Sequence, residues 1–101
     1  MRIDQLLSRH KPSFSFEFFP PKDEEGFAQL YRTLETLKPL APTFVSVTFG
    51  AGGGTRAKTV DLVKRIKTEI GLEPMAHLTC VGMDRKQLSG ILDELQSSGI
   101  D

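Results

Sequence analysis

The feature that most constrains the fold of this chain is a repeat of about thirty residues. Segments with the two-residue period of a β-strand begin near Phe14, Phe44 and Met75, and apolar residues at helical spacing follow each of them. Strands that alternate with helices at this spacing are typical of βα units, which build a parallel sheet. With a short leading helix over residues 1–10, the sequence predicts an α/β fold of three βα units.

Turn and capping residues mark where these elements begin and end. Pro20 and Pro21 close the first strand, because neither can donate a hydrogen bond to a sheet ladder. Asp84 and Gln87 have the spacing of a capping box at the start of the third helix, and Gly71 ends the second helix. The predicted strands span residues 13–19, 43–49 and 74–80.

The length of the chain limits the architecture that three units can complete. A closed (β/α)8 TIM barrel requires about 250 residues, whereas this chain has 101. Three units correspond to the first three-eighths of such a barrel, and alone they leave two strand edges unpaired. We therefore expect residues 1–101 to be a single partial domain, the N-terminal part of a TIM barrel, in a truncated chain.

Charge and cysteine content exclude several classes of function. The 13 basic and 13 acidic residues balance, so neither a nucleic-acid-binding nor a membrane-surface footprint is present. A single cysteine, Cys80, excludes an internal disulfide and any metal site built on several thiolates. The N-terminus has no apolar h-region, and no apolar run approaches membrane-spanning length. We expect a cytoplasmic protein without a metal site.

One acidic residue lies within an aromatic strand. Alternation places Phe14, Phe16 and Phe18 on the face toward the helices and Ser15 and Glu17 on the opposite face. A carboxyl group withdrawn from water has a raised pKa and can serve as a general acid or base. The alternative is that Glu17 pairs with a basic residue inside a barrel.

Polar residues recur near the carboxyl ends of all three predicted strands, where sites form in parallel α/β folds. The last polar residue is Glu17 on the first strand and Thr48 on the second, and the third strand carries His77 and Thr79. Equivalent faces would bring a carboxylate, a hydroxyl and an imidazole to one rim. Alternatively, the threonines are ordinary strand residues and His77 is a core histidine.

The glycine-rich run Gly50–Thr55 raises the question of phosphate binding. Backbone amides before a helix can hold an anion, but the run lacks the lysine of a P-loop and the third small residue of the dinucleotide fingerprint. A Rossmann domain is therefore disfavoured. A TIM-barrel enzyme whose glycine loop holds a phosphate remains an alternative.

Three stretches together resemble a known family. Residues 15–22 (SFEFFPPK), 44–53 (FVSVTFGAGG) and 77–80 (HLTC) are similar, in sequence and spacing, to methylenetetrahydrofolate reductase of the bacterial type. The resemblance implies a (β/α)8 flavoprotein of one-carbon and methionine metabolism. Such an enzyme reduces 5,10-methylenetetrahydrofolate to 5-methyltetrahydrofolate, with FAD as cofactor and NAD(P)H as reductant in a ping-pong cycle.

The resemblance also assigns roles to individual residues. Glu17 matches the glutamate that acts as general acid when the five-membered ring of the folate opens. Thr48 matches a residue that meets the nicotinamide nucleotide, and Phe49, Ala51 and His77 match residues that line the FAD. The resemblance further implies a homo-oligomeric full-length enzyme.

The chain departs from the family pattern in one important respect. It does not contain the Arg-Gly-Asp strand end of the family, whose aspartate lies beside flavin and folate, and it covers about the first third of the barrel. We therefore expect the 101-residue chain to be colourless and inactive alone. A non-catalytic α/β fragment that binds a partner is the alternative from a different functional class.

Overall fold

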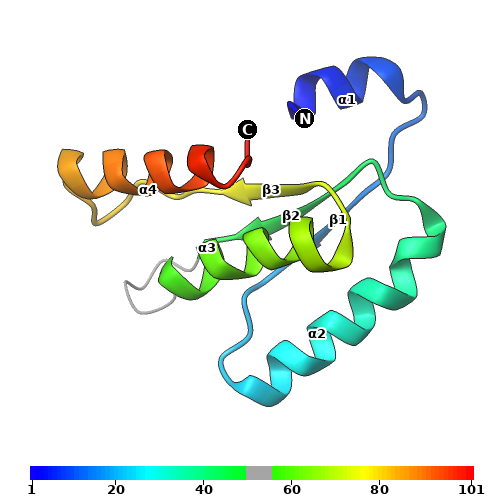
Figure 1. The fold of residues 1–101 in the computed structure, drawn as a ribbon, viewed down its shortest axis with the longest axis horizontal. Coiled ribbons are helices and arrows are strands. Elements are labelled where there is room, and N and C mark those ends of the chain that lie inside the picture. Colours follow the sequence, from blue (N-terminus) through cyan, green and yellow to red (C-terminus); the bar gives the residue numbers. More distant parts are fainter. Residues whose placement is uncertain (50–55) are drawn as a thin grey trace.

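The computed structural model describes residues 1–49 and 56–101. Helices and strands alternate along the chain after a leading helix, in the order that the thirty-residue repeat predicts (Figure 1). The elements are α1 (Ile3–Arg9), β1 (Ser15–Phe18), α2 (Glu24–Leu37), the 3₁₀ turn η1 (Lys38–Leu40), β2 (Phe44–Thr48), α3 (Arg56–Arg65), the π-helical turn η3 (Ile66–Ile70), β3 (Pro74–His77) and α4 (Arg85–Ser97).

The three strands form one parallel sheet in the order β1-β2-β3. In the register of the sheet, Glu17 of β1 lies beside Ser46 of β2, and Thr48 of β2 lies beside His77 of β3. The prediction of an α/β fold with successive parallel βα units is thereby confirmed. The arrangement is compatible with part of a TIM barrel.

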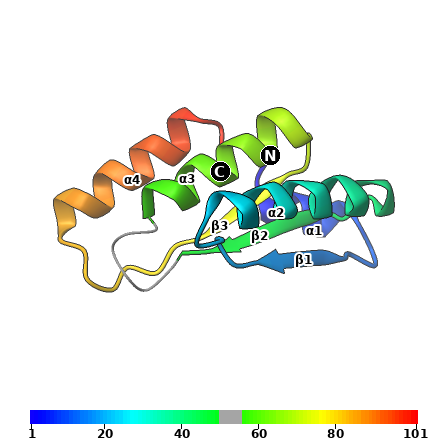
Figure 2. The same ribbon diagram turned by 90° about the horizontal axis from the view of Figure 1, so that it is seen from below.

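The molecule has two layers, with α2, α3 and α4 on the same face of the sheet (Figure 2). The alternation of side chains explains this arrangement, because β1 directs Phe16 and Phe18, and β2 directs Val45 and Val47, to that face. Val45 and Val47 are fully buried and Phe49 is 2% exposed. The core is completed by Leu30, Leu34, Val60, Leu62, Val63, Ile66, Ile70, Leu72, Leu95 and Ile100.

The predicted capping residues occupy the positions expected of them. The Asp84 side chain accepts a hydrogen bond from the backbone N–H of Gln87 at 2.7 Å, and Gln87 Oε1 accepts from the N–H of Asp84 at 3.1 Å. Asp23 caps α2 in the same way by accepting from the N–H of Gly26 at 2.7 Å. Gly71, with φ of 81°, ends the second helical segment in the left-handed conformation.

The strands are shorter than the sequence predicted. β1 begins at Ser15, and Phe14 before it is 68% exposed rather than packed against the helices. The chain still adjoins β2 there, since the N–H of Thr43 donates to the carbonyl of Phe14 at 2.8 Å. β3 likewise ends at His77, three residues before the predicted boundary at Cys80.

Candidate active site

Glu17, Thr48 and His77 lie on the face of the sheet opposite the helices. Phe16 and Phe18 on β1 pack against the core, so Glu17 between them points the other way. All three residues lie in the last two positions of their strands, where parallel α/β folds place their functional groups. The sequence prediction that a carboxylate, a hydroxyl and an imidazole meet at one rim is confirmed in its geometry.

The three side chains share a single carboxylate oxygen. The hydroxyl of Thr48 donates to Oε1 of Glu17 at 2.6 Å, a short distance typical of a charge-assisted hydrogen bond. Nδ1 of His77 lies 3.6 Å from the same Oε1 atom. The Glu17 side chain is 52% exposed and the His77 side chain 58% exposed, so a ligand can reach both.

The electrostatics favour an ionised Glu17 in the unliganded chain. The hydroxyl of Thr48 lowers the pKa of Glu17 most strongly, and the hydrogen bonding and charge of His77 lower it further. Partial desolvation acts in the opposite direction but does not overcome these effects. Glu17 is therefore an ionised carboxylate here, and further desolvation must raise its pKa before it can act as a general acid.

Comparison with known proteins decides the family. Residues 2–101 match the family model of methylenetetrahydrofolate reductase. The chain belongs to this family. The resemblance carried by the three motifs is thus confirmed.

The relatives include bacterial and plant enzymes. The chain is 44% identical over 86 residues to the 5,10-methylenetetrahydrofolate reductase of Pectobacterium carotovorum subsp. carotovorum, an alignment that covers 85% of this chain and 29% of that protein. It is 42% identical over 86 residues, with the same coverage, to the enzyme of that name from Escherichia coli strain K12. It is 37% identical over 99 residues to methylenetetrahydrofolate reductase (NADH) 1 of Arabidopsis thaliana, which covers 98% of this chain and 17% of that protein. The chain therefore spans less than a third of these relatives.

The resemblance to methylenetetrahydrofolate reductase also assigned Phe49 and Ala51 to the cofactor. The Phe49 side chain belongs to the core on the helical face, while its backbone N–H donates to the carbonyl of His77 at 3.0 Å. Ala51 and the rest of the glycine run lie outside the described residues. Among the predicted cofactor residues that the structure describes, Thr48 and His77 present side chains beside Glu17.

Sequence reasoning did not select Ser46, which lies beside Glu17 in the sheet register and is only 7% exposed. The signal was available, because Ser46 shares the strand face of Thr48 two residues away. Across residues 1–49 and 56–101, no three His, Cys, Asp or Glu side chains gather as a metal site would require.

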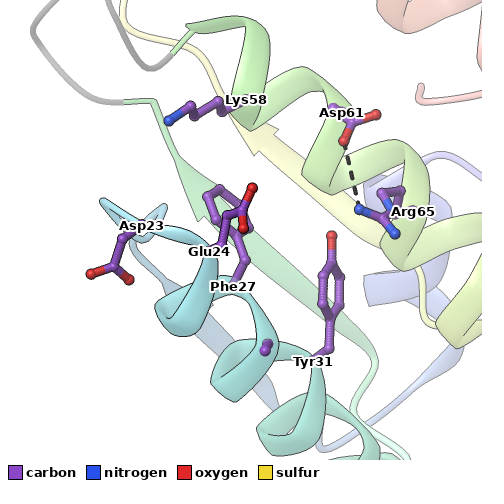
Figure 3. A pocket seen from close by; sticks show the side chains of 8 residues that line it. Asp23, Glu24, Phe27, Tyr31, Lys58, Asp61 and Arg65 are labelled. Atoms are coloured by element: carbon purple, nitrogen blue, oxygen red, sulfur yellow. Dashed lines mark ion pairs between the residues drawn. The ribbon is translucent and has the colours of Figure 1, made fainter.

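A separate groove of about 440 Å³ lies between α2 and α3, on the helical side of the molecule. Arg65 lines this groove (Figure 3). Its Nη1 atom lies 4.0 Å from Oδ2 of Asp61, and its guanidinium lies 5.0 Å from the ring centre of Tyr31. Burial raises the pKa of Tyr31. The contact of Arg65 with Tyr31 connects α3 to α2, and the groove lies on the helical side of the sheet, opposite to the face that carries Glu17.

No helix within the described part of the chain is long and apolar enough to cross a membrane.

Proposed function

We propose that this chain forms the acid-bearing part of a flavin-dependent enzyme that reduces 5,10-methylenetetrahydrofolate to 5-methyltetrahydrofolate with NAD(P)H. The observation that carries the proposal is the meeting of Glu17, Thr48 and His77 at one end of a parallel sheet. Membership in the methylenetetrahydrofolate reductase family supports it. The proposal also includes a TIM barrel in the whole protein, a cytoplasmic location and a homo-oligomeric enzyme.

Glu17 would donate the proton that this reaction needs. Opening the five-membered ring of the folate expels an amine nitrogen, which must be protonated as it leaves. The exposed carboxyl of Glu17 can deliver that proton once bound ligands remove water from it and raise its pKa. The hydroxyl of Thr48 fixes Oε1 and thereby orients the other oxygen, Oε2, for this transfer.

The hydrogen-bonding groups on this face also fit a flavin nucleotide. Thr48 offers a hydroxyl and His77 an imidazole on an open, half-exposed surface, and both groups can hydrogen-bond a nucleotide. A bound flavin supplies the hydride that reduces the opened folate. Because the flavin and folate would lie over this face, they would exclude water from Glu17.

A chimera tests the proposal directly. The matched 29% of the Pectobacterium carotovorum enzyme would be replaced by this chain, and the purified protein would be examined for flavin absorbance and for folate reduction with NADH and NADPH. We expect a yellow protein that reduces the folate with at least one nucleotide. A folded, flavin-loaded chimera that leaves the folate unreduced would overturn the proposal.

The isolated chain provides a second test. We propose that the 101-residue protein alone does not retain FAD, because three strands supply only one side of a binding site. Purified chain mixed with FAD and desalted should be colourless. Stoichiometric flavin after desalting would show that this chain holds the cofactor without the rest of the barrel.

A further inference from the structure

Arg56 connects two segments that leave the carboxyl ends of neighbouring strands. It is the first residue of α3, and its Nη2 atom donates to the carbonyl oxygen of Val81 at 3.2 Å and of Gly82 at 3.3 Å. Both carbonyls lie between the end of β3 at His77 and the start of α4 at Arg85. One side chain therefore joins the helix after β2 to the segment after β3.

The position of Arg56 is electrostatically unfavourable for its own helix. The N-terminus of a helix carries partial positive charge, which acidic side chains stabilise and cations oppose. α2 follows this rule with Glu24 and Glu25 in its first turn, whereas the first turn of α3 has no acidic residue and begins with Arg56. A cation that opposes its helix needs compensating partners, and the two carbonyls provide them.

The backbone of the receiving segment is matched to this contact. Gly82 has a φ of 74°, a conformation that residues with side chains rarely adopt. A Cβ atom at this position would lie 3.4 Å from Nη2 of Arg56. The Val81 side chain is 75% exposed while its carbonyl accepts the guanidinium. The conformation thus directs two successive carbonyls to one nitrogen.

This segment begins at the candidate active site. The carbonyl of His77 accepts from the N–H of Phe49 at 3.0 Å, so the end of β3 is attached to β2. Arg56 attaches the chain a second time only a few residues later, at Val81 and Gly82. Residues 78–80 therefore lie between two attachments, and His77 stands at the first of them.

We propose that Arg56 is a positioning residue of the candidate active site, which fixes the segment after β3 and thereby holds His77 beside Glu17. The catalytic importance of this contact rests on the proposed function, but its geometry exists in the chain without any ligand. Arg56 acts through the backbone carbonyls that it binds, and the imidazole of His77 is the group it positions.

The test uses the isotopically labelled 101-residue chain and three variants. Arg56→Ala removes both hydrogen bonds, and Arg56→Lys keeps the charge but replaces the planar guanidinium by a single ammonium group. Arg85→Ala is the matched control, because Arg85 is the first residue of α4 and is exposed. It removes a cation from the same position of a different helix.

Two measurements follow the segment and the site. The ¹⁵N heteronuclear NOE reports the mobility of residues 78–84, and the ¹³Cδ shift of Glu17 against pH reports its titration midpoint. In Arg56→Ala we expect the NOE values of residues 78–84 to fall. The Glu17 midpoint should rise, because the hydrogen bonding and charge of His77 that lower it are lost. Arg56→Lys should give intermediate values, and Arg85→Ala should match the wild type.

Unchanged NOE values and an unchanged Glu17 midpoint in Arg56→Ala would overturn the proposal, as would equal changes in Arg85→Ala. If Arg56→Ala does not fold, the same two measurements on Arg56→Lys test the proposal. NOE values and a Glu17 midpoint equal to those of the wild type would then show that the guanidinium is not required. Neither flavin nor folate is present in these measurements. Failure here therefore leaves the proposed function standing, and an inactive chimera leaves the role of Arg56 standing.

Discussion

Oε1 of Glu17 accepts a hydrogen bond from the hydroxyl of Thr48 and also faces the imidazole of His77. Both contacts lower the pKa of Glu17. The folded chain holds the pKa of Glu17 below its ordinary value of 4.5. The interaction therefore stabilises the fold above pH 4.5, and this contribution is lost as the pH falls through the lowered value. Acid should loosen this rim before it affects the apolar core.

Removing the Thr48 hydroxyl should bring the pKa of Glu17 back toward its ordinary value. In Thr48→Val the strongest contribution to the lowered pKa of Glu17 disappears, so its titration midpoint should rise. The ¹³Cδ shift of Glu17 measured against pH reads this directly. Thr36→Val is the control, since the Thr36 hydroxyl donates to the carbonyl of Arg32 within α2. Equal midpoints in the two variants would show that the 2.6 Å bond does not persist in solution.

Glu17→Gln separates proton transfer from electron transfer in the chimera. Glutamine keeps an oxygen that accepts from Thr48 but carries no acidic proton. Reduction of the flavin by NAD(P)H should remain close to wild type, whereas folate reduction should fall by about 10²–10⁴-fold. Stopped-flow absorbance of each half-reaction distinguishes them. Equal loss in both half-reactions would refute the general-acid role.

At the scale of the elements, sequence patterns correctly predicted the helix ends, which depend on residues close together in the chain. The Asp84–Gln87 capping box and the left-handed Gly71 follow from helix-end chemistry that acts within a few residues. The position of Phe14 could not be read in this way. Its place in the alternation predicted burial, but the paired register of β1 starts one residue later, at Ser15, and Phe14 is 68% exposed.

In the candidate site, too, the sequence predicted some features and not others. Placing Glu17 with Thr48 and His77 required only alternation and parallel register, which the sequence displays. Their convergence on a single oxygen depends on rotamers that no periodicity encodes. The contact of Arg56 with Gly82 was also invisible, because it joins residues 26 positions apart through backbone carbonyls. Phe49 was assigned by resemblance, and its side chain lies in the core.

The α4 cap offers a stability test at this scale. Asp84→Ala removes the carboxylate that accepts the N–H of Gln87 and should lower the free energy of unfolding by about 1 kcal/mol. Urea unfolding followed by circular dichroism measures the change. Asp93→Ala, at an exposed position further along α4, is the control. If both variants unfold at the same urea concentration, the cap does not limit the stability of α4.

The whole molecule has helices on one face of its sheet and open strand edges. Within residues 1–49 and 56–101, β1 and β3 each pair on one side only. Phe14 and Phe19, which flank β1, are 68% and 75% exposed. Unpaired edges beside exposed aromatic side chains favour association between chains. The isolated chain should therefore associate as its concentration rises.

Sedimentation velocity over a concentration series measures this association. Phe19→Lys should shift the chain toward the monomer by placing a charge beside the edge of β1. Leu40→Lys is the control, because Leu40 is similarly exposed at 67% but lies in η1 away from the strands. A wild-type chain that stays monomeric throughout the series would contradict this expectation.

The alternation of β1 has a consequence for how such a chain can change over generations. Phe16 and Phe18 contact the helices while Glu17 between them serves the opposite face. Point substitutions can alter either face almost independently. Inserting or deleting one codon within β1 would instead exchange the two faces at once, burying the acid and exposing the aromatic rings. We therefore expect a substitution in β1 to perturb one face at a time, whereas a change in its length should perturb both faces.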